Sequence, residues 1–198
     1  MNETLTRTII ALGLAATGLL LLFLHLEIVV LGAAITGVVF DFLYINFSDD
    51  SINLLLPTLI VLVPVVSCLF SLYSCYQEQP LLVIGLVTLV QLSDVLQYFA
   101  GRRFGVTRIG WISPKKTLEG YAAAIGVLFL SVTVLMPGYT LDSLVVLLLG
   151  ITGGIVNSIV KRTLGIKDWS PLLGSHGGFL DRTDSIYLPS LYLAWRLR

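Results

Sequence analysis

Apolar residues form a series of long runs along the chain, with polar residues gathered between them. A hydrocarbon core about 30 Å thick needs roughly 20 helical residues at about 1.5 Å each. Six runs approach that length: Thr8 to Leu24, Ile28 to Ile45, Leu54 to Tyr73, Leu81 to Ala100, Tyr121 to Met136 and Leu144 to Val160. A shorter seventh, Ile186 to Leu197, spans only if the bilayer thins or its arginines snorkel. The pattern predicts an all-α polytopic membrane protein with about six to seven transmembrane helices.

Composition agrees with this class and excludes two others. The chain of 198 residues is 56% hydrophobic and only 12% charged, whereas soluble domains carry about a quarter charged residues. Its 12 basic and 12 acidic residues cancel, which argues against a disordered chain and against a nucleic-acid partner. The basic residues are unevenly placed, because Arg7 is the only one before Arg102.

Two loops hold most of the positive charge. Residues 101–120 and residues 161–184 together carry nine lysines and arginines. Basic residues in short loops are retained on the cytoplasmic side of the membrane. We therefore expect a multi-pass protein of the cytoplasmic (inner) membrane, with both loops, and the site that they form, facing the cytoplasm.

The first basic loop reads GRRFGVTRIGWISPKKTLEG. Orientation or contact with anionic lipid headgroups is the simplest interpretation of its charge, but its glycines also suit backbone that approaches a ligand. The segment from Ser113 is interpreted as the approach to a helix, because Pro114 presets a backbone angle there. A helix start beside lysines would offer N–H groups and charge to a phosphate. There is no P-loop signature.

The second basic loop adds carboxylates to the lysines and arginines. Asp181 and Asp184 are three residues apart and would share one helix face, as would Ser158 and Arg162 at a spacing of four. Mg²⁺ takes oxygen ligands, usually one or two protein carboxylates with substrate phosphates. His176 either binds a phosphate or caps a turn, and the cap is the favoured interpretation. Zinc is disfavoured, since two histidines and two cysteines are scattered along the chain.

Two carboxylates lie inside apolar runs, where a charge at mid-helix costs about 2.5–3.5 kcal/mol on insertion scales. Asp94 has polar neighbours three or four residues away, Gln91, Gln97 and Tyr98, which predict a polar stripe on one helix face. We interpret Asp94 as part of a site wall or as a metal neighbour. Asp41 is nearer a helix end and lacks such neighbours, so it is interpreted as a structural hydrogen-bonding residue.

Both loops resemble the signatures of one enzyme family, the phosphatidate cytidylyltransferases, and the resemblance covers about residues 80–198. The residues that match in the first loop are Asp94, Tyr98, Gly101, Arg102, Gly105, Ser113, Pro114, Lys115, Lys116, Thr117, Glu119 and Gly120. Those in the second are Ser158, Lys161, Arg162, Lys167, Asp168, Ser170, Leu173, His176, Gly177, Gly178, Asp181, Arg182 and Asp184.

The resemblance implies transfer of a cytidylyl group from CTP to phosphatidic acid, which gives CDP-diacylglycerol and pyrophosphate in phospholipid biosynthesis. It implies a Mg²⁺ cofactor on Asp181, Asp184 and Asp94, with K⁺ as a further cation. The implied catalytic residues are Asp181, Lys161, Arg162, Lys167, Asp168 and Arg182. The implied substrate-binding residues are Arg102, Ser113, Lys115, Lys116, Thr117, Ser158, His176, Gly177 and Gly178. Membrane lipids and a second copy of the chain, forming a homodimer, are the further implied partners.

The resemblance also predicts the domain organisation, with residues 1–80 as a transmembrane anchor and residues 81–198 as the catalytic membrane domain. The chain departs from the family's pattern in three places: Gly154 stands where an aspartate of the metal site is expected, Asn157 where a glutamate is expected, and Gly174-Ser175 where Pro-Gly is usual. The chain is also shorter than a typical bacterial member. An alternative therefore stays open, a diverged relative of weak or no activity that binds lipid or nucleotide as a membrane subunit.

Overall fold

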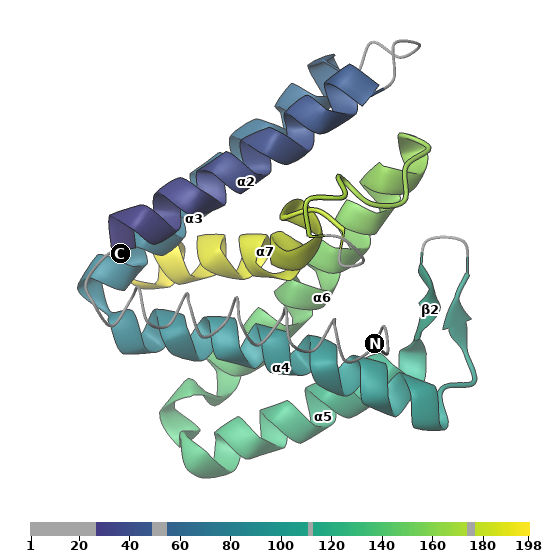
Figure 1. The fold of residues 1–198 in the computed structure, drawn as a ribbon. Coiled ribbons are helices and arrows are strands. Elements are labelled where there is room, and N and C mark those ends of the chain that lie inside the picture. Colours follow the sequence, from purple (N-terminus) through teal and green to yellow (C-terminus); the bar gives the residue numbers. More distant parts are fainter. Residues whose placement is uncertain (1–26, 49–54, 111–112, 174–176) are drawn as a thin grey trace, which may run out of the picture. The chain divides into compact units, whose positions relative to one another are not determined.

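The computed structural model describes residues 27–48, 55–110, 113–173 and 177–198. Within these ranges the chain is almost entirely α-helical, as predicted (Figure 1). The helices are α2 (Glu27–Ser48), α3 (Leu55–Glu78), α4 (Pro80–Phe104), α5 (Leu118–Leu135), α6 (Thr140–Thr163) and α7 (Leu180–Arg196). Two short strands, β1 (Arg108–Ile109) and β2 (Ser113–Thr117), connect α4 to α5, and a 3-10 turn, η1 (Pro137–Tyr139), precedes α6.

The apolar runs of the sequence coincide with helices from Ile28 onward, while the run from Thr8 to Leu24 lies outside the described residues. The helices extend past the runs at their polar ends. Helix α4, for example, continues to Phe104 and takes Arg102 and Arg103 into its last turn. Cations are stabilising at that end of a helix, because the backbone dipole is negative there.

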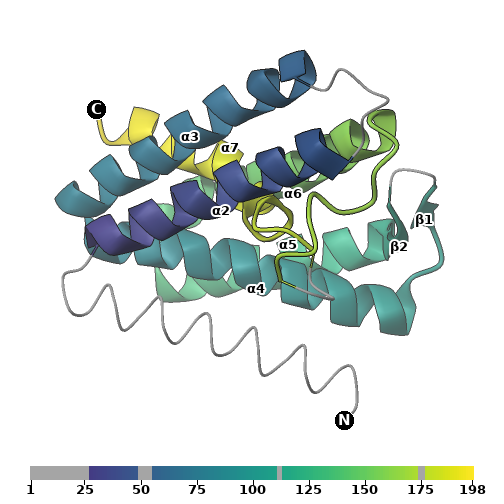
Figure 2. The same ribbon diagram turned by 45° about the horizontal axis from the view of Figure 1, so that its top comes forward.

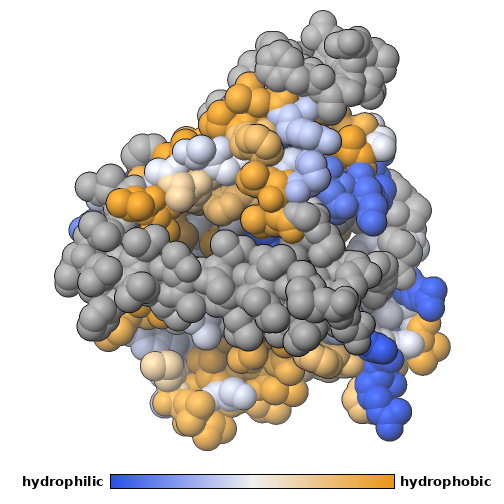
Figure 3. All heavy atoms as spheres, viewed as in Figure 1, coloured by the Kyte–Doolittle hydropathy of each residue, from blue (hydrophilic) through white to orange (hydrophobic). Residues whose placement is uncertain are grey.

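The protein is an all-α membrane protein. Helices α4 and α5, and the segment Pro137–Thr163 that contains α6, are each long and apolar enough to cross a bilayer, and Val29–Ile45 is a shorter apolar helix. Large apolar side chains of α5 are exposed, among them Leu130, Val134 and Leu135, and the surface over α5 at the bottom of the view is predominantly hydrophobic (Figure 3). Such a surface suits contact with lipid.

The chain forms two compact units. Unit 1 comprises residues 1–73 with residues 168–182, and unit 2 comprises residues 74–167 with residues 183–198. The segment 168–182, which holds much of the second sequence motif, therefore belongs with the N-terminal helices. The functional division predicted at residue 80 stays a prediction.

In unit 2, α4 and α5 pack along each other and α6 packs against both. The β1–β2 hairpin stands beyond the adjoining ends of α4 and α5 (Figures 1 and 2). Glycines permit the close approach at that end: a Cβ on Gly120 would lie 2.7 Å from the Gln97 carbonyl oxygen, and one on Gly105 would lie 2.6 Å from the Thr117 methyl carbon. These glycines of the first loop thus serve helix packing.

In unit 1, one face of α2 is buried. It contains Gly37, Val38, Asp41, Phe42 and Ile45, which recur at the spacing of a helix face. The fully buried Trp169 packs on Phe42, with ring centroids 5.5 Å apart. The core of unit 1 thus joins α2 to the start of the segment 168–182.

Candidate active site

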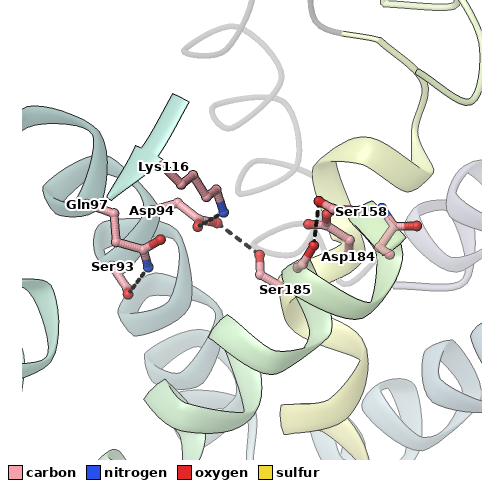
Figure 4. A network of polar contacts seen from close by, with 9 residues as sticks. Ser93, Asp94, Gln97, Lys116, Ser158, Asp184 and Ser185 are labelled. Atoms are coloured by element: carbon pink, nitrogen blue, oxygen red, sulfur yellow. Dashed lines mark hydrogen bonds and ion pairs between the residues drawn. The ribbon is translucent and has the colours of Figure 1, made fainter. Parts of the chain in front are cut away.

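A polar cluster forms in unit 2 where α4, β2 and α7 meet (Figure 4). Asp94 of α4 accepts a hydrogen bond from the Ser185 hydroxyl of α7 at 2.9 Å, and its other carboxylate oxygen lies 3.8 Å from the Lys116 amine of β2. The side chains of Asp94 and Lys116 are each 37% exposed, so both partners remain accessible to a ligand. The structure thus gives Asp94 the charged partner that a carboxylate inside an apolar helix requires.

Helix α6 completes the cluster with an amide and a glycine. The Asn157 side-chain amide donates to the Asp184 carboxylate at 3.0 Å. One turn away, a Cβ on Gly154 would lie 3.6 Å from the Lys116 amine and 4.0 Å from an Asp184 carboxylate oxygen. Two of the positions that depart from the resembled signature, Gly154 and Asn157, therefore face the cluster, whereas Gly174 and Ser175 lie outside the described residues.

The charges of the cluster perturb one another. Burial raises the pKa of Asp184 above its ordinary value, although the Asn157 hydrogen bond, Lys116 and Lys161 oppose the shift. Burial also opposes the charge on Lys116, but Asp94, Tyr121 and Asp184 outweigh it, and the pKa of Lys116 is raised. Lys116 is therefore a persistent cation, which lies 5.5 Å from the Tyr121 ring centroid.

The segment from Ser113 leads into a helix, as predicted, and the structure adds that it does so as a strand. Strand β2 pairs with β1 in antiparallel register, Arg108 opposite Thr117 and Ile109 opposite Ser113. Helix α5 begins at Leu118, where the Thr117 hydroxyl caps it by accepting the Gly120 N–H. Extended backbone at the cap residue is typical of an N-cap, so Lys116 is presented from a strand.

A carboxylate clamp fixes the other side of this hairpin. Glu119 of α5 accepts the backbone N–H groups of Val106 and Thr107, at 3.0–3.1 Å. These donors begin the connection from α4 to β1, so the clamp joins the two ends of the hairpin. The first motif thus supports the strand that carries Lys116, a role that the sequence pattern did not indicate.

The predicted polar stripe beside Asp94 divides into separate pairs. The Gln97 amide donates to the Ser93 hydroxyl at 2.8 Å (Figure 4), and Tyr98 accepts from Arg102 at 3.3 Å. Neither contact involves Asp94. The helix spacing was correct, but the neighbours of each side chain depend on what packs against α4.

Other predicted site residues lie around these elements. Ser158 donates to the Gly154 carbonyl and Arg162 to the Ile166 carbonyl, each at 2.8 Å, so both side chains bond to backbone near α6. Lys167, Asp168 and Arg182 are exposed. His176 lies outside the described residues, as does the side chain of Lys115.

The second motif folds in unit 1 around Asp181. The Asp181 carboxylate accepts the backbone N–H groups of Trp169 and Gly178, both at 2.9 Å. Gly177 has a φ of +80°, and a Cβ there would lie 2.6 Å from an Asp181 carboxylate oxygen. Glycine is thus required twice over, by conformation and by space, and Asp181 closes the segment 168–182 into a compact loop.

Asp41 is a structural hydrogen-bonding residue, as predicted, but the sequence did not indicate its partners. Its side chain is fully buried on α2 and accepts hydrogen bonds from the Ser170 hydroxyl and from the Leu180 N–H, the latter at 2.7 Å. Its partners are 129 and 139 residues away in the chain. The only signal in the sequence was the cost of a charge in an apolar run, which indicates that a partner exists without indicating which one.

The chemistry of the polar cluster fits a hard cation with phosphates. Asp94 and Asp184 are oxygen donors that face the same lysine, and Mg²⁺ commonly takes one or two carboxylates and completes its shell with water and phosphate. Among the residues that the structure describes, three or more His, Cys, Asp or Glu side chains do not gather as a metal site. A metal ion bound here would therefore take several of its ligands from substrate phosphates and water.

Comparison with known proteins places these features in a family. The model of the cytidylyltransferase family matches residues 2–197. Phosphatidate cytidylyltransferase of Aquifex aeolicus is 40% identical over 113 residues, which are 52% of this chain and 43% of the relative. The Helicobacter pylori enzyme of the same name is 36% identical over 135 residues, 63% of this chain and 50% of the relative. That of Synechocystis sp. is 41% identical over 103 residues, 47% and 35% respectively. This chain thus covers half or less of the length of these relatives.

Proposed function

The chain belongs to the cytidylyltransferase family, and from this premise we propose that it transfers the cytidylyl group of CTP to phosphatidic acid, giving CDP-diacylglycerol and pyrophosphate. The observation that carries the proposal is the convergence of Asp94, Lys116 and Asp184 from three separate elements of unit 2. A phosphomonoester carries roughly −1.5 to −2 charges near neutral pH. Its approach to a triphosphate therefore needs the combination of cations and metal-binding carboxylates that this cluster offers.

The reaction requires positioning more than acid–base chemistry. An oxygen of the phosphatidic acid phosphate attacks the α-phosphorus of CTP, and a new P–O bond forms. The bond from that phosphorus to the oxygen bridging toward the β-phosphorus breaks, and pyrophosphate leaves with the electron pair. Because the nucleophile is already anionic, no general base is needed. Electrostatic stabilisation and alignment then dominate the rate.

Residues of the cluster would divide this work. Asp94 and Asp184 would hold Mg²⁺, which supplies positive charge to the triphosphate when bound. Lys116 and Lys161, both of which interact with Asp184, would neutralise phosphate oxygens. The family signature also implies nucleotide contacts from the segment 161–184, through Arg162, Lys167 and Arg182.

The membrane location suits these substrates. The diacyl chains of phosphatidic acid stay in the bilayer, while CTP arrives from water. We propose a multi-pass arrangement with the cluster on the cytoplasmic side, because Lys116 and Lys161 belong to the two basic loops that the positive-inside rule retains there. Reaction of an impermeant cysteine reagent with Lys116→Cys in right-side-out and inverted vesicles tests this side. Labelling from the outside of intact cells would contradict it.

The test of the activity is direct. Purified full-length protein in lipid nanodiscs, supplied with CTP, phosphatidic acid and Mg²⁺, is expected to release pyrophosphate and CDP-diacylglycerol in equal amounts. Asp184→Asn is expected to lower kcat by about 10²-fold or more, which is typical for loss of an electrostatic group in an active site. Asp142→Asn is the matched control, since Asp142 is a carboxylate of the same unit that pairs with Arg196 and Tyr192.

The alternative of an inactive relative makes a different prediction. Folded wild-type protein that binds CTP but releases no product would contradict the transferase and support a lipid- or nucleotide-binding subunit. An equal loss of kcat in Asp184→Asn and Asp142→Asn would contradict a role of the polar cluster in the reaction.

A further inference from the structure

Asp41 is the most deeply buried carboxylate among the described residues, and it lies in the middle of an apolar helix face. Its side chain is 0% exposed, and Val38, Phe42 and Ile45 on the same face of α2 are also buried. An ionised carboxylate in such surroundings destabilises the fold unless it is hydrogen-bonded. Leaving it buried without partners costs more free energy than an ordinary hydrogen bond contributes to stability. The hydrogen-bond partners of Asp41 therefore show which part of the chain it stabilises.

Those partners are both in the segment 168–182. The Ser170 hydroxyl donates to one carboxylate oxygen, and the Leu180 N–H donates to the other at 2.7 Å. Leu180 is the first residue of α7, so the carboxylate satisfies a backbone donor that the helix itself leaves unpaired. Asp41 thus holds the segment at two points ten residues apart.

The sequence on both sides of this contact is shaped around it. A Cβ on Gly178 would lie 2.7 Å from the Asp41 carboxyl carbon, and a Cβ on Gly37 would lie 2.8 Å from the Phe179 ring. Neither position has room for a side chain. Trp169 on Phe42 adds a third contact beside Ser170. The segment is therefore fixed on α2 by fit as well as by hydrogen bonds.

We infer that Asp41 is a positioning residue of the transferase, whose carboxylate fixes the segment 168–182 and the start of α7 in one geometry. The inference rests on the proposed function, because the family signature behind that function implies nucleotide contacts from this segment. Asp41 touches no reacting group itself: it acts through Ser170 and through the start of α7. Misplacement by about 1 Å can cost about 10²-fold in rate, so the contact matters beyond its contribution to stability.

The first experiment measures the contact without any need for activity. Hydrogen–deuterium exchange of the full chain in nanodiscs is followed for the peptide that contains Phe179 and Leu180. Asp41→Asn is expected to speed exchange there by 10-fold or more, since an amide nitrogen cannot accept both donors. Thr36→Ala is the matched control on α2, because the Thr36 hydroxyl bonds only to the Gly32 carbonyl of its own helix among the contacts described. Unchanged exchange in Asp41→Asn would overturn the inference, whatever the enzyme does.

The second experiment asks whether the contact serves catalysis. Asp41→Asn is expected to lower kcat at least 10-fold, and Ser170→Ala, a milder variant that keeps the carboxylate, at least 3-fold. Gly178→Ala is expected to lose at least 10-fold in the wild-type background but no more than 3-fold in Asp41→Ala, because removal of the carboxylate makes room for the methyl group. Two results would overturn the inference and leave Asp41 with a structural role only. One is faster exchange in Asp41→Asn with unchanged kcat, and the other is additive effects of Gly178→Ala and Asp41→Ala on kcat.

A wild-type protein that makes no CDP-diacylglycerol, with exchange behaving as expected, would refute the proposed function and remove the catalytic role with it. The two failures are therefore distinguishable. The exchange arm addresses the contact between α2 and the segment, and the turnover arm addresses its use.

Discussion

Unit 1 and unit 2 use the same side chain in opposite ways. In unit 1 the carboxylates of Asp41 and Asp181 accept backbone N–H groups and a hydroxyl, and they shape a loop. In unit 2 the carboxylates of Asp94 and Asp184 face a lysine that is partly open to solvent. The hydrogen-bond donors decide the role of each carboxylate. One that is bonded to backbone N–H groups fixes a conformation, whereas one that is paired with a partly exposed lysine side chain remains available to a ligand.

The largest expected effect tests the cation that defines unit 2. Lys116→Met should lower kcat by about 10²–10³-fold, because it removes positive charge where phosphate charge develops. Arg196→Met is the matched control, since Arg196 also pairs with a carboxylate of unit 2 but is 57% exposed, and exposed pairs contribute little. Steady-state pyrophosphate release measures both. Similar losses of kcat in the two variants would contradict a specific role of Lys116 in the reaction.

Metal dependence separates the two kinds of carboxylate. Asp94→Asn should raise the Mg²⁺ concentration for half-maximal activity by about 10-fold or more, because it removes a proposed ligand. Asp41→Asn should lower turnover and leave that concentration within about 2-fold, because Asp41 acts on protein geometry. Activity over a Mg²⁺ titration measures the difference. An equal shift in both variants would abolish the distinction between the units.

A glycine in unit 2 offers a gain of function. Gly154→Asp should lower the half-saturating Mg²⁺ concentration or raise turnover several-fold, because its Cβ would meet Lys116 and Asp184 at ordinary contact distances of 3.6 and 4.0 Å. The same titration, with Gly154→Asn as the uncharged control, measures the effect of the added charge. If the wild type is active and Gly154→Asp changes neither quantity, the metal takes its carboxylates elsewhere.

The smallest expected effect concerns backbone conformation alone. Gly165 ends α6 at a φ of +73° with no neighbour within 4 Å of its missing Cβ, so Gly165→Ala should cost only about 1 kcal/mol of folding free energy. Gly177→Ala in unit 1 should cost more, since its Cβ would also press on Asp181. Thermal unfolding in nanodiscs compares the two. A larger loss in Gly165→Ala would show that the Asp181 loop tolerates displacement.

The sequence predicted the helical architecture well, because membrane helices are encoded locally by runs of apolar residues. It also identified Asp94 as a carboxylate in need of a partner, which the structure confirms. It predicted that the segment from Ser113 approaches a helix, which the structure confirms, but not that this approach is a strand ending at the Thr117 cap of α5. It offered ligand approach as one use of the glycines of the first loop, and the structure adds a packing role for Gly105 and Gly120.

What the sequence by itself determined is the set of helices, the two loops in which basic residues gather and the family's residues in order. Tertiary structure alone decided which carboxylates face a cation and which hold backbone. Ser185 reaches Asp94 across 91 residues, and Leu180 reaches Asp41 across 139. Helix periodicity relates residues three and four apart, but contacts over such separations depend on how whole helices and loops pack, and no local pattern records them.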